Sequence, residues 1–186
     1  MVMSEDHRRL AVELDATARA LVGRRITGVA YYGLYTDHPP ATWDFDTWHC
    51  PVMGVELLLD DGAAYSAVWD NPFGHFSLHL YAAPMTSQLT VYEQGGNGLR
   101  WTVHDHARWA PLLAGPVLDS RLIWHPHLTD FGHQAPAALH LTFPAGSVWI
   151  IAAMESTEET WWLGADEVVV AFTSDMAART GVRGPG

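Results

Sequence analysis

The feature that most constrains the fold is a similarity between the two halves of the chain. Residues 18–32 read ARALVGRRITGVAYY, and residues 110–124 read APLLAGPVLDSRLIW. Pairing Gly23 with Gly115 gives an offset of 115 − 23 = 92 residues, and the same offset aligns the apolar residues that follow each glycine. Self-similarity at a constant spacing is typical of chains that are built from repeated structural units.

A second pair of segments extends the similarity. VELLLDDGAAYSAVW occupies residues 55–69 and LHLTFPAGSVWIIAA occupies residues 139–153, with Gly62 and Gly146 aligned. Apolar runs on both sides of a glycine turn predict a β-hairpin in each half. Each half then reads as a helix, a strand, a long connection and a hairpin. The sequence therefore predicts an internal duplication, with units at about 4–92 and 99–175.

The remaining elements agree with a mixed fold. Residues 4–22 predict a helix, because Ser4 can cap its first turn and Gly23 follows as a stop. Further predicted elements are a hairpin at 89–105 around GGNG, a short second helix that Asp105 caps and Gly115 ends, and a last strand at 167–173. We expect an α+β fold with a mostly antiparallel, strongly curved sheet or half-barrel, and a frayed tail at 176–186.

Size and charge narrow the classes of function. A chain of 186 residues suits a single domain, 1–186, and the formal net charge is −11. An acidic chain repels phosphate backbones, so we expect no nucleic-acid partner, and the same charge disfavours anionic membrane surfaces. A basic protein partner would instead be attracted. The single cysteine, Cys50, excludes an intrachain disulfide, and no signal peptide is visible, so we expect a cytoplasmic protein. The usage of alanine, glycine, tryptophan and arginine suggests a bacterial source.

The first long connection carries aromatic and acidic residues together. Trp43, Asp44, Asp46 and Trp48 lie within six positions. Aromatic side chains bury a large area on binding, and carboxylates beside them favour a cationic partner. We therefore predict that these four residues bind a partner. The alternative is that the tryptophans fold back and cover an open end of the sheet.

The second long connection is rich in histidine. WHPHLTDFGH, residues 124–133, contains His125, His127, Asp130 and His133. Two histidines and a carboxylate would suit zinc or non-haem iron, so these four residues are candidate ligands for a divalent metal. The alternative is a connecting loop with no metal, and the sequence contains no established ligand spacing such as HExxH. Apart from this divalent metal, we expect no cofactor.

Two functional hypotheses follow from different classes. No GxSxG, phosphate-binding loop or dinucleotide fingerprint is present, which favours a non-enzymatic binding protein, such as an immunity-type inhibitor that uses the acidic aromatic loop. The alternative is a small-molecule-binding enzyme, such as a cyclase, isomerase or hydrolase, whose pocket consists of histidine, aspartate and aromatic residues. One form of this hypothesis is a metal-dependent enzyme. A solidly packed interior favours the first hypothesis, and a concave cavity beneath the histidines favours the second.

Overall fold

The computed structural model describes residues 4–34, 42–91, 94–126, 134–157 and 160–182. The chain is α+β, and its strands form two antiparallel five-stranded sheets. In spatial order the first sheet contains β5 (Ser77–Tyr81), β4 (Ala64–Asp70), β3 (Gly54–Leu59), β1 (Ile26–Leu34) and β6 (Gly98–Thr102). The second contains β2 (Trp48–Val52), β10 (Thr160–Ala171), β9 (Gly146–Thr157), β8 (Ala135–Phe143) and β7 (Asp119–His125).

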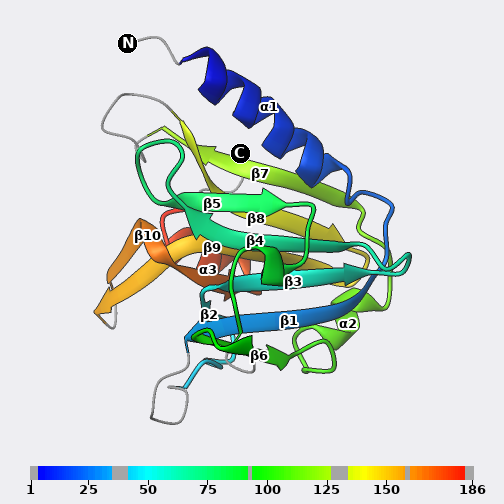
Figure 1. Ribbon diagram of the computed structural model, residues 1–186. Coiled ribbons are helices and arrows are strands. Elements are labelled where there is room, and N and C mark those ends of the chain that lie inside the picture. Colours follow the sequence, from blue (N-terminus) through cyan, green and yellow to red (C-terminus); the bar gives the residue numbers. More distant parts are fainter. Residues whose placement is uncertain (1–3, 35–41, 92–93, 127–133, 158–159, 183–186) are drawn as a thin grey trace.

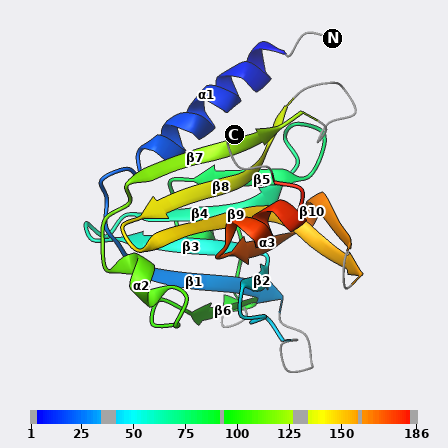
Figure 2. The same ribbon diagram turned by 180° about the vertical axis from the view of Figure 1, so that it is seen from behind.

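The two sheets are stacked, with the core between them (Figures 1 and 2). Alternate residues of each strand face this core, because successive side chains of a strand point to opposite faces. Leu57 of the first sheet and Leu139 and Ile150 of the second are fully buried there. The space between the sheets is therefore filled by side chains of the core.

Helices cover the remaining apolar surfaces. Helix α1 (Glu5–Arg19) runs along β7 and β5 and buries Leu14 and Ala18, and the Ser4 hydroxyl accepts a hydrogen bond from His7 N, as the sequence predicted. Helix α2 (Ala110–Leu113) precedes β7, and α3 (Ser174–Arg179) lies against the outer face of the second sheet (Figure 2). A short 3₁₀ helix, η1 (Met85–Ser87), packs on β3 and β4 of the first sheet.

The strand order is the same in the two sheets over four strands. The first sheet runs β1-β3-β4-β5 and the second runs β7-β8-β9-β10, each with one further strand at an edge. The segments that precede β1 and β7 also pair directly, since Gly23 N donates to Val117 O and Val117 N donates to Arg24 O, both at 2.8 Å. This arrangement is compatible with a duplication, which stays a prediction, as does strong curvature of the sheets.

Three local expectations need correction. The predicted hairpin at 89–105 is wrong, because β6 pairs with β1, and the described residues before β6 contribute one isolated parallel bridge, from Val91 to Gly98. Asp105 does not cap α2. The N-cap residue is Trp109, whose side chain makes no capping hydrogen bond.

The expectation of a frayed tail from residue 176 also needs correction. Helix α3 continues to Arg179 and Val182 is buried, whereas 183–186 lie outside the described residues.

Strand β2 was not expected from the sequence at all. It lies inside the first long connection and adds to the second sheet beside β10, so residues from the first half of the chain complete a sheet of the second half. Val52 at its end has a positive φ of 68°, where the chain leaves this sheet for β3 of the other. No helix of the described residues is long and apolar enough to cross a bilayer.

Candidate functional site

The segment 42–49 has one side that faces the body of the protein and one that faces outward. Asp44 forms an isolated antiparallel bridge with His49, so the chain doubles back over four residues. Asp46 lies at the turn with a φ of 66°, and its backbone N–H donates to Asp44 Oδ1 at 2.9 Å. Aspartate tolerates this left-handed conformation better than most residues, which explains why it occupies the turn.

On the inner side, His49 is completely buried and takes part in a chain of polar contacts. Its Nδ1 lies 2.7 Å from the Tyr31 hydroxyl, and Trp109 Nε1 donates to the same hydroxyl at 2.6 Å. Tyr31 belongs to β1 in the first sheet and His49 to β2 in the second. The contact therefore joins the two sheets through a fully buried pair of side chains.

The other ring nitrogen of His49 faces a small polar cluster. His49 Nε2 lies 3.4 Å from Asp44 Oδ1, and His106 Nε2 lies 3.1 Å from Asp44 Oδ2. One ligand atom from each of these three residues lies within 4.8 Å of the other two. Two imidazoles and one carboxylate form a donor set that suits zinc or iron.

Aromatic rings enclose this cluster on the protein side. The Trp43 ring packs against His49 with a centroid separation of 4.9 Å and against His106 at 5.7 Å, and Phe172 contacts His49 at 4.7 Å. Asp44 keeps 41% of its side chain exposed and His106 keeps 25%. The cluster is therefore buried at His49 and open to solvent at its other two members.

Burial controls the ionisation of the inner side chains. Desolvation, with a smaller contribution from the nearby His106, lowers the pKa of His49 to about 4. Burial raises the pKa of Tyr31 well above its usual value, against the hydrogen bond from Trp109. The hydrogen bond from Asp46 N and that from His106 hold the pKa of Asp44 below its usual value. At neutral pH the cluster thus contains a neutral His49 beside an ionised Asp44.

The outer side of the segment is aromatic. Phe45 stacks on Trp48 with ring centroids 4.1 Å apart, and Trp48 contacts Trp161 of β10 edge-on at 4.9 Å. Phe45 is 40% exposed. Asp46 holds the turn against the body of the protein through an ion pair with Arg108, whose Nε also donates to Asp46 O at 2.9 Å.

Two carboxylates lie beside these rings. Trp161 is paired across the strands with Glu155 of β9, and Glu167 Oε2 of β10 lies 3.9 Å from the Cys50 thiol of β2. Desolvation and the neighbouring Asp166 raise the pKa of Glu167, and burial raises that of Cys50 to about 12, so Cys50 is no thiolate nucleophile. We name the set Phe45, Trp48, Trp161, Glu155 and Glu167 the aromatic–acidic surface.

The structure separates the four residues that were predicted to contact a partner. Trp48 belongs to the aromatic–acidic surface and Asp46 is largely exposed, whereas Trp43 packs inward and Asp44 joins the histidine cluster. The adjacent tryptophans of β10 also divide, since Trp161 packs on the core and Trp162 is 57% exposed. This division follows from the alternation of side chains along a strand.

The predicted metal site of the second connection stays a prediction, because three of its four residues lie outside the described residues. His125 ends β7 and is half-buried, and residues 127, 130 and 133 lie outside the described residues. The cluster of Asp44, His49 and His106 was missed because His106 is 62 residues from Asp44 in sequence. His106 reaches the other two because the loop after β6 lies beside segment 42–49, and no local spacing in the sequence indicates that contact.

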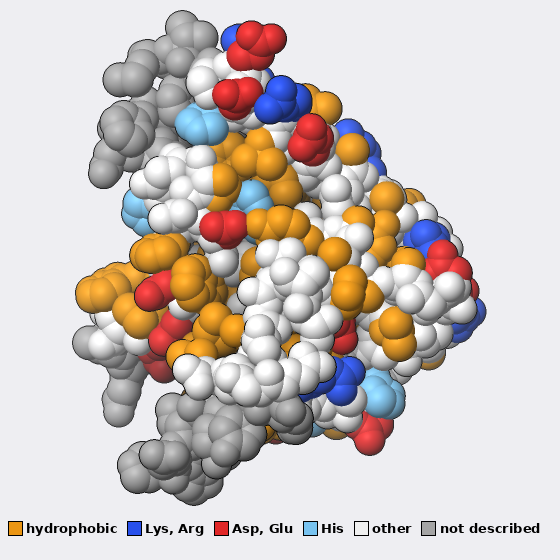
Figure 3. Space-filling model, viewed as in Figure 1, with side chains coloured by type: hydrophobic (Ala, Val, Ile, Leu, Met, Phe, Trp, Pro, Cys, Tyr) orange, Lys and Arg blue, Asp and Glu red, His pale blue; other side chains and the backbone are white. Residues whose placement is uncertain are grey.

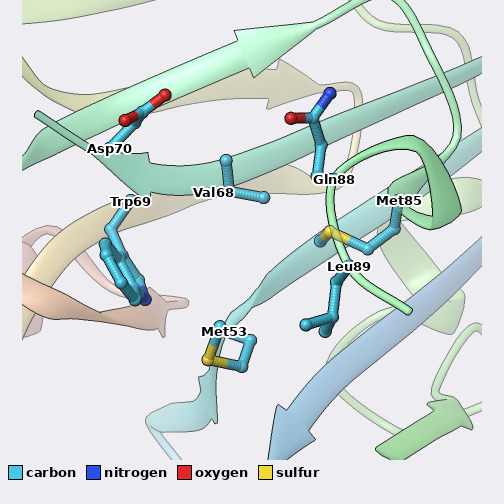
Figure 4. Close-up of a pocket in the computed structure, with 7 residues that line it drawn as sticks. All are labelled: Met53, Val68, Trp69, Asp70, Met85, Gln88 and Leu89. Atoms are coloured by element: carbon cyan, nitrogen blue, oxygen red, sulfur yellow. The ribbon is translucent and has the colours of Figure 1, made fainter. Parts of the chain in front are cut away.

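A cavity of about 230 Å³ lies on the outer face of the first sheet, between β4 and the η1 segment (Figure 4). Met53, Val68, Met85 and Leu89 make its walls mostly apolar, and Asp70 lies at one end. Both carboxylate oxygens of Asp70 are already engaged, by Tyr81 at 2.6 Å and by Asn71 N at 2.7 Å. Asp44, His49 and His106 do not line this cavity.

No protein-family model, curated protein or solved structure matches this chain.

Proposed function

We propose that this chain is a binding protein that captures a basic protein partner through the aromatic–acidic surface. One observation carries the proposal: Glu155 lies opposite Trp161 across β9 and β10, Glu167 lies beside Cys50 of β2, and neither carboxylate forms an ion pair within the described residues. Aromatic side chains are enriched at the centre of protein interfaces, and polar side chains form the rim.

Charge over a long stretch of sequence supports a basic partner. Between Arg121 and Arg179 the chain has seven acidic residues and no lysine or arginine. Strands β8, β9 and β10 fall inside this stretch. A negative field over the second sheet would raise the encounter rate with a cationic protein and would lose its effect at high salt.

The electrostatics of Glu167 favour the same kind of partner. Its pKa is raised because the carboxyl is partly desolvated and lies near Asp166. A lysine or arginine from a partner would relieve this penalty, since an opposite charge favours the ionised carboxylate. An immunity-type inhibitor that neutralises a basic toxin in the cytoplasm is one form of this function.

The alternative of a small-molecule enzyme has less support. Leu139, Ile150 and Val170 fill the space between the sheets with no exposed surface, so no concave cavity lies at the centre of the sandwich in the described residues. Asp44, His49 and His106 also line none of the three cavities characterised on the described surface.

Affinity capture with a matched control tests the proposal. The immobilised protein is exposed to a lysate of the organism that encodes it, beside a Phe45→Ala/Glu155→Gln/Glu167→Gln variant and a Trp162→Ala variant. Trp162 lies on β10 like Trp161 but on the opposite face, and it is the more exposed of the two. A specific partner must be basic, must be retained by Trp162→Ala and must be lost by the triple variant.

The captured protein is then purified and its affinity is measured by titration calorimetry at low and high salt. The proposal predicts an affinity that falls with ionic strength and is at least about tenfold weaker for the triple variant, which corresponds to about 1.4 kcal/mol. An acidic partner, or equal loss of binding in both variants, would contradict the assignment of this surface.

A further inference from the structure

We propose that Asp44, His49 and His106 form a binding site for a divalent transition-metal ion, with zinc as the ion that fits best. This site goes beyond the partner-binding function and does not depend on it. Zinc binds imidazole nitrogen at about 2.0–2.1 Å and carboxylate oxygen at about 2.0–2.2 Å, so tetrahedral ligand atoms lie roughly 3.3–3.5 Å apart. His49 Nε2 lies 3.4 Å from Asp44 Oδ1 and His106 Nε2 lies 3.1 Å from Asp44 Oδ2. One ligand atom of each residue lies within 4.8 Å of the other two, so small side-chain shifts would bring all three to one ion.

An unsatisfied nitrogen is the second, independent observation. His49 Nε2 is buried and has no hydrogen-bond partner within the described residues, and its contact with Asp44 at 3.4 Å lacks the geometry of a hydrogen bond. A buried polar atom without a partner costs about 1–3 kcal/mol. Coordination of an ion at Nε2 would satisfy the atom at the point where a carboxylate and a second imidazole also converge.

The surroundings of His49 resemble the outer shell of a metal ligand. For Nε2 to coordinate, the ring hydrogen must be on Nδ1, where it would donate to the Tyr31 oxygen at 2.7 Å. That oxygen already accepts a hydrogen bond from Trp109 Nε1 and would accept a second, so the hydrogen of the Tyr31 hydroxyl would turn away from His49. Metal-bound histidines generally donate their other ring N–H in this way, which fixes the orientation of the ring. The ring is also held by Trp43 and Phe172.

A hydrogen bond of His106 competes with metal coordination and lowers the affinity of the site for a metal ion. His106 Nδ1 accepts a hydrogen bond from Arg108 N at 3.2 Å, which favours the hydrogen on Nε2, facing Asp44. Coordination through Nε2 would move that hydrogen to Nδ1 and break this long bond. The three residues therefore have two arrangements: a hydrogen-bonded one without metal and a coordinated one with it.

The donor set selects among metals. Two nitrogen ligands exclude a preference for Ca²⁺ or Mg²⁺, which take mainly oxygen ligands. Three protein ligands with an exposed side at Asp44 leave a fourth position for water, the arrangement of open zinc sites.

Titration of untagged protein with zinc chloride tests the inference. Calorimetry at pH 7.5 is expected to show one equivalent bound by the wild-type chain, with affinity reduced at least about tenfold in His106→Gln and in Asp44→Asn. His104→Gln is the matched control, because His104 is an exposed histidine two residues from His106 and outside the cluster. This control must bind zinc as the wild type does, and magnesium chloride must give no heat of binding.

His106→Gln is the informative variant, since its side chain is partly exposed and its loss leaves the buried Tyr31–His49 contact in place. Circular dichroism confirms that each variant is folded before titration. The inference is overturned if the wild-type chain binds no zinc, if His106→Gln and Asp44→Asn bind it with unchanged affinity, or if His104→Gln weakens binding as much as they do.

Discussion

The Tyr31 hydroxyl and His49 Nδ1 lie 2.7 Å apart although the two residues belong to different sheets. Both side chains are fully buried, and Trp109 completes the chain of contacts. The sandwich thus has a polar connection across one end of its otherwise apolar interior. This connection holds the inner side of segment 42–49 in place, and that segment carries Asp44 and the edge of the aromatic–acidic surface.

Removal of the Tyr31 hydroxyl is expected to destabilise the fold. Tyr31→Phe leaves His49 Nδ1 and Trp109 Nε1 buried without their partner, so the free energy of unfolding should fall by about 1–3 kcal/mol. Urea denaturation followed by circular dichroism measures the change. Tyr65→Phe is the control: this tyrosine is also buried, and its hydroxyl makes no side-chain hydrogen bond within the described residues. Equal stability losses in the two variants would show that the Tyr31 contact adds nothing.

Stability should fall as the pH is lowered from about 6.5 to 4. Because the pKa of His49 is lowered to about 4 in the folded state, the unfolded chain binds this proton first and is favoured as the pH falls. The loss from His49 is at most about 3 kcal/mol, and burial of His79 and His140 lowers their pKa values in the same direction. His49→Gln should flatten the pH dependence in this window more than His79→Gln does. A free energy of unfolding of the wild type that stays constant between pH 6.5 and 4 would contradict the lowered pKa of His49.

Backbone strain at Val52 predicts that the glycine variant of this position is more stable than the alanine variant. Its φ of 68° is strongly disfavoured for a β-branched residue, and it follows from the turn between β2 and β3. Glycine in a strand is ordinarily about 0.5–1 kcal/mol less stable than alanine. At position 52 we expect the reverse, with Val52→Gly about 1 kcal/mol more stable than Val52→Ala, because glycine alone has no Cβ to clash. Thermal unfolding of the two variants gives the order directly, and greater stability of the alanine variant would contradict the strained geometry.

The ion pair between Arg108 and Asp46 should restrict the motion of the turn at residues 45–48 more than it raises the free energy of unfolding. Both side chains are substantially exposed, so Arg108→Gln should change the free energy of unfolding by less than about 1 kcal/mol. Loss of both Arg108 contacts should nevertheless speed hydrogen exchange of the backbone amides at residues 45–48. Exchange measured by mass spectrometry, with Arg121→Gln as the control, checks this expectation. Unchanged exchange in this segment would mean that the ion pair does not hold the turn.

Local sequence signals predicted the elements whose contacts are local. Ser4 and Gly23 mark the ends of the first helical segment, and the turns at Gly62 and Gly146 mark the hairpins β3–β4 and β8–β9. The antiparallel α+β fold follows from these elements. The same kind of signal failed at GGNG, because β6 found its partner in β1, far away in sequence.

The candidate site could not be predicted in the same way. Trp48 is predicted from its neighbours to bind a partner; the structure shows its ring contacts with Phe45 and Trp161, and its binding role stays a prediction. Its ring partner Trp161 comes from β10, which is more than a hundred residues away in the chain, and Glu167 of the same strand contacts Cys50. His106 reaches Asp44 only because the loop after β6 lies beside segment 42–49. Pairing of distant strands determines both sites, and single-sequence patterns carry little information about such pairing.

Anomalous X-ray scattering at the zinc edge tests the metal site most directly. A crystal of the untagged protein that was grown with zinc chloride is measured on both sides of the absorption edge. The account predicts one strong peak bonded to Asp44, to Nε2 of His49 and to Nε2 of His106, with bond lengths of about 2.0–2.2 Å. A map without a peak at these three residues, in which His106 Nε2 still lies within hydrogen-bond distance of Asp44, would contradict the metal site. The three residues would then only stabilise segment 42–49 through hydrogen bonds.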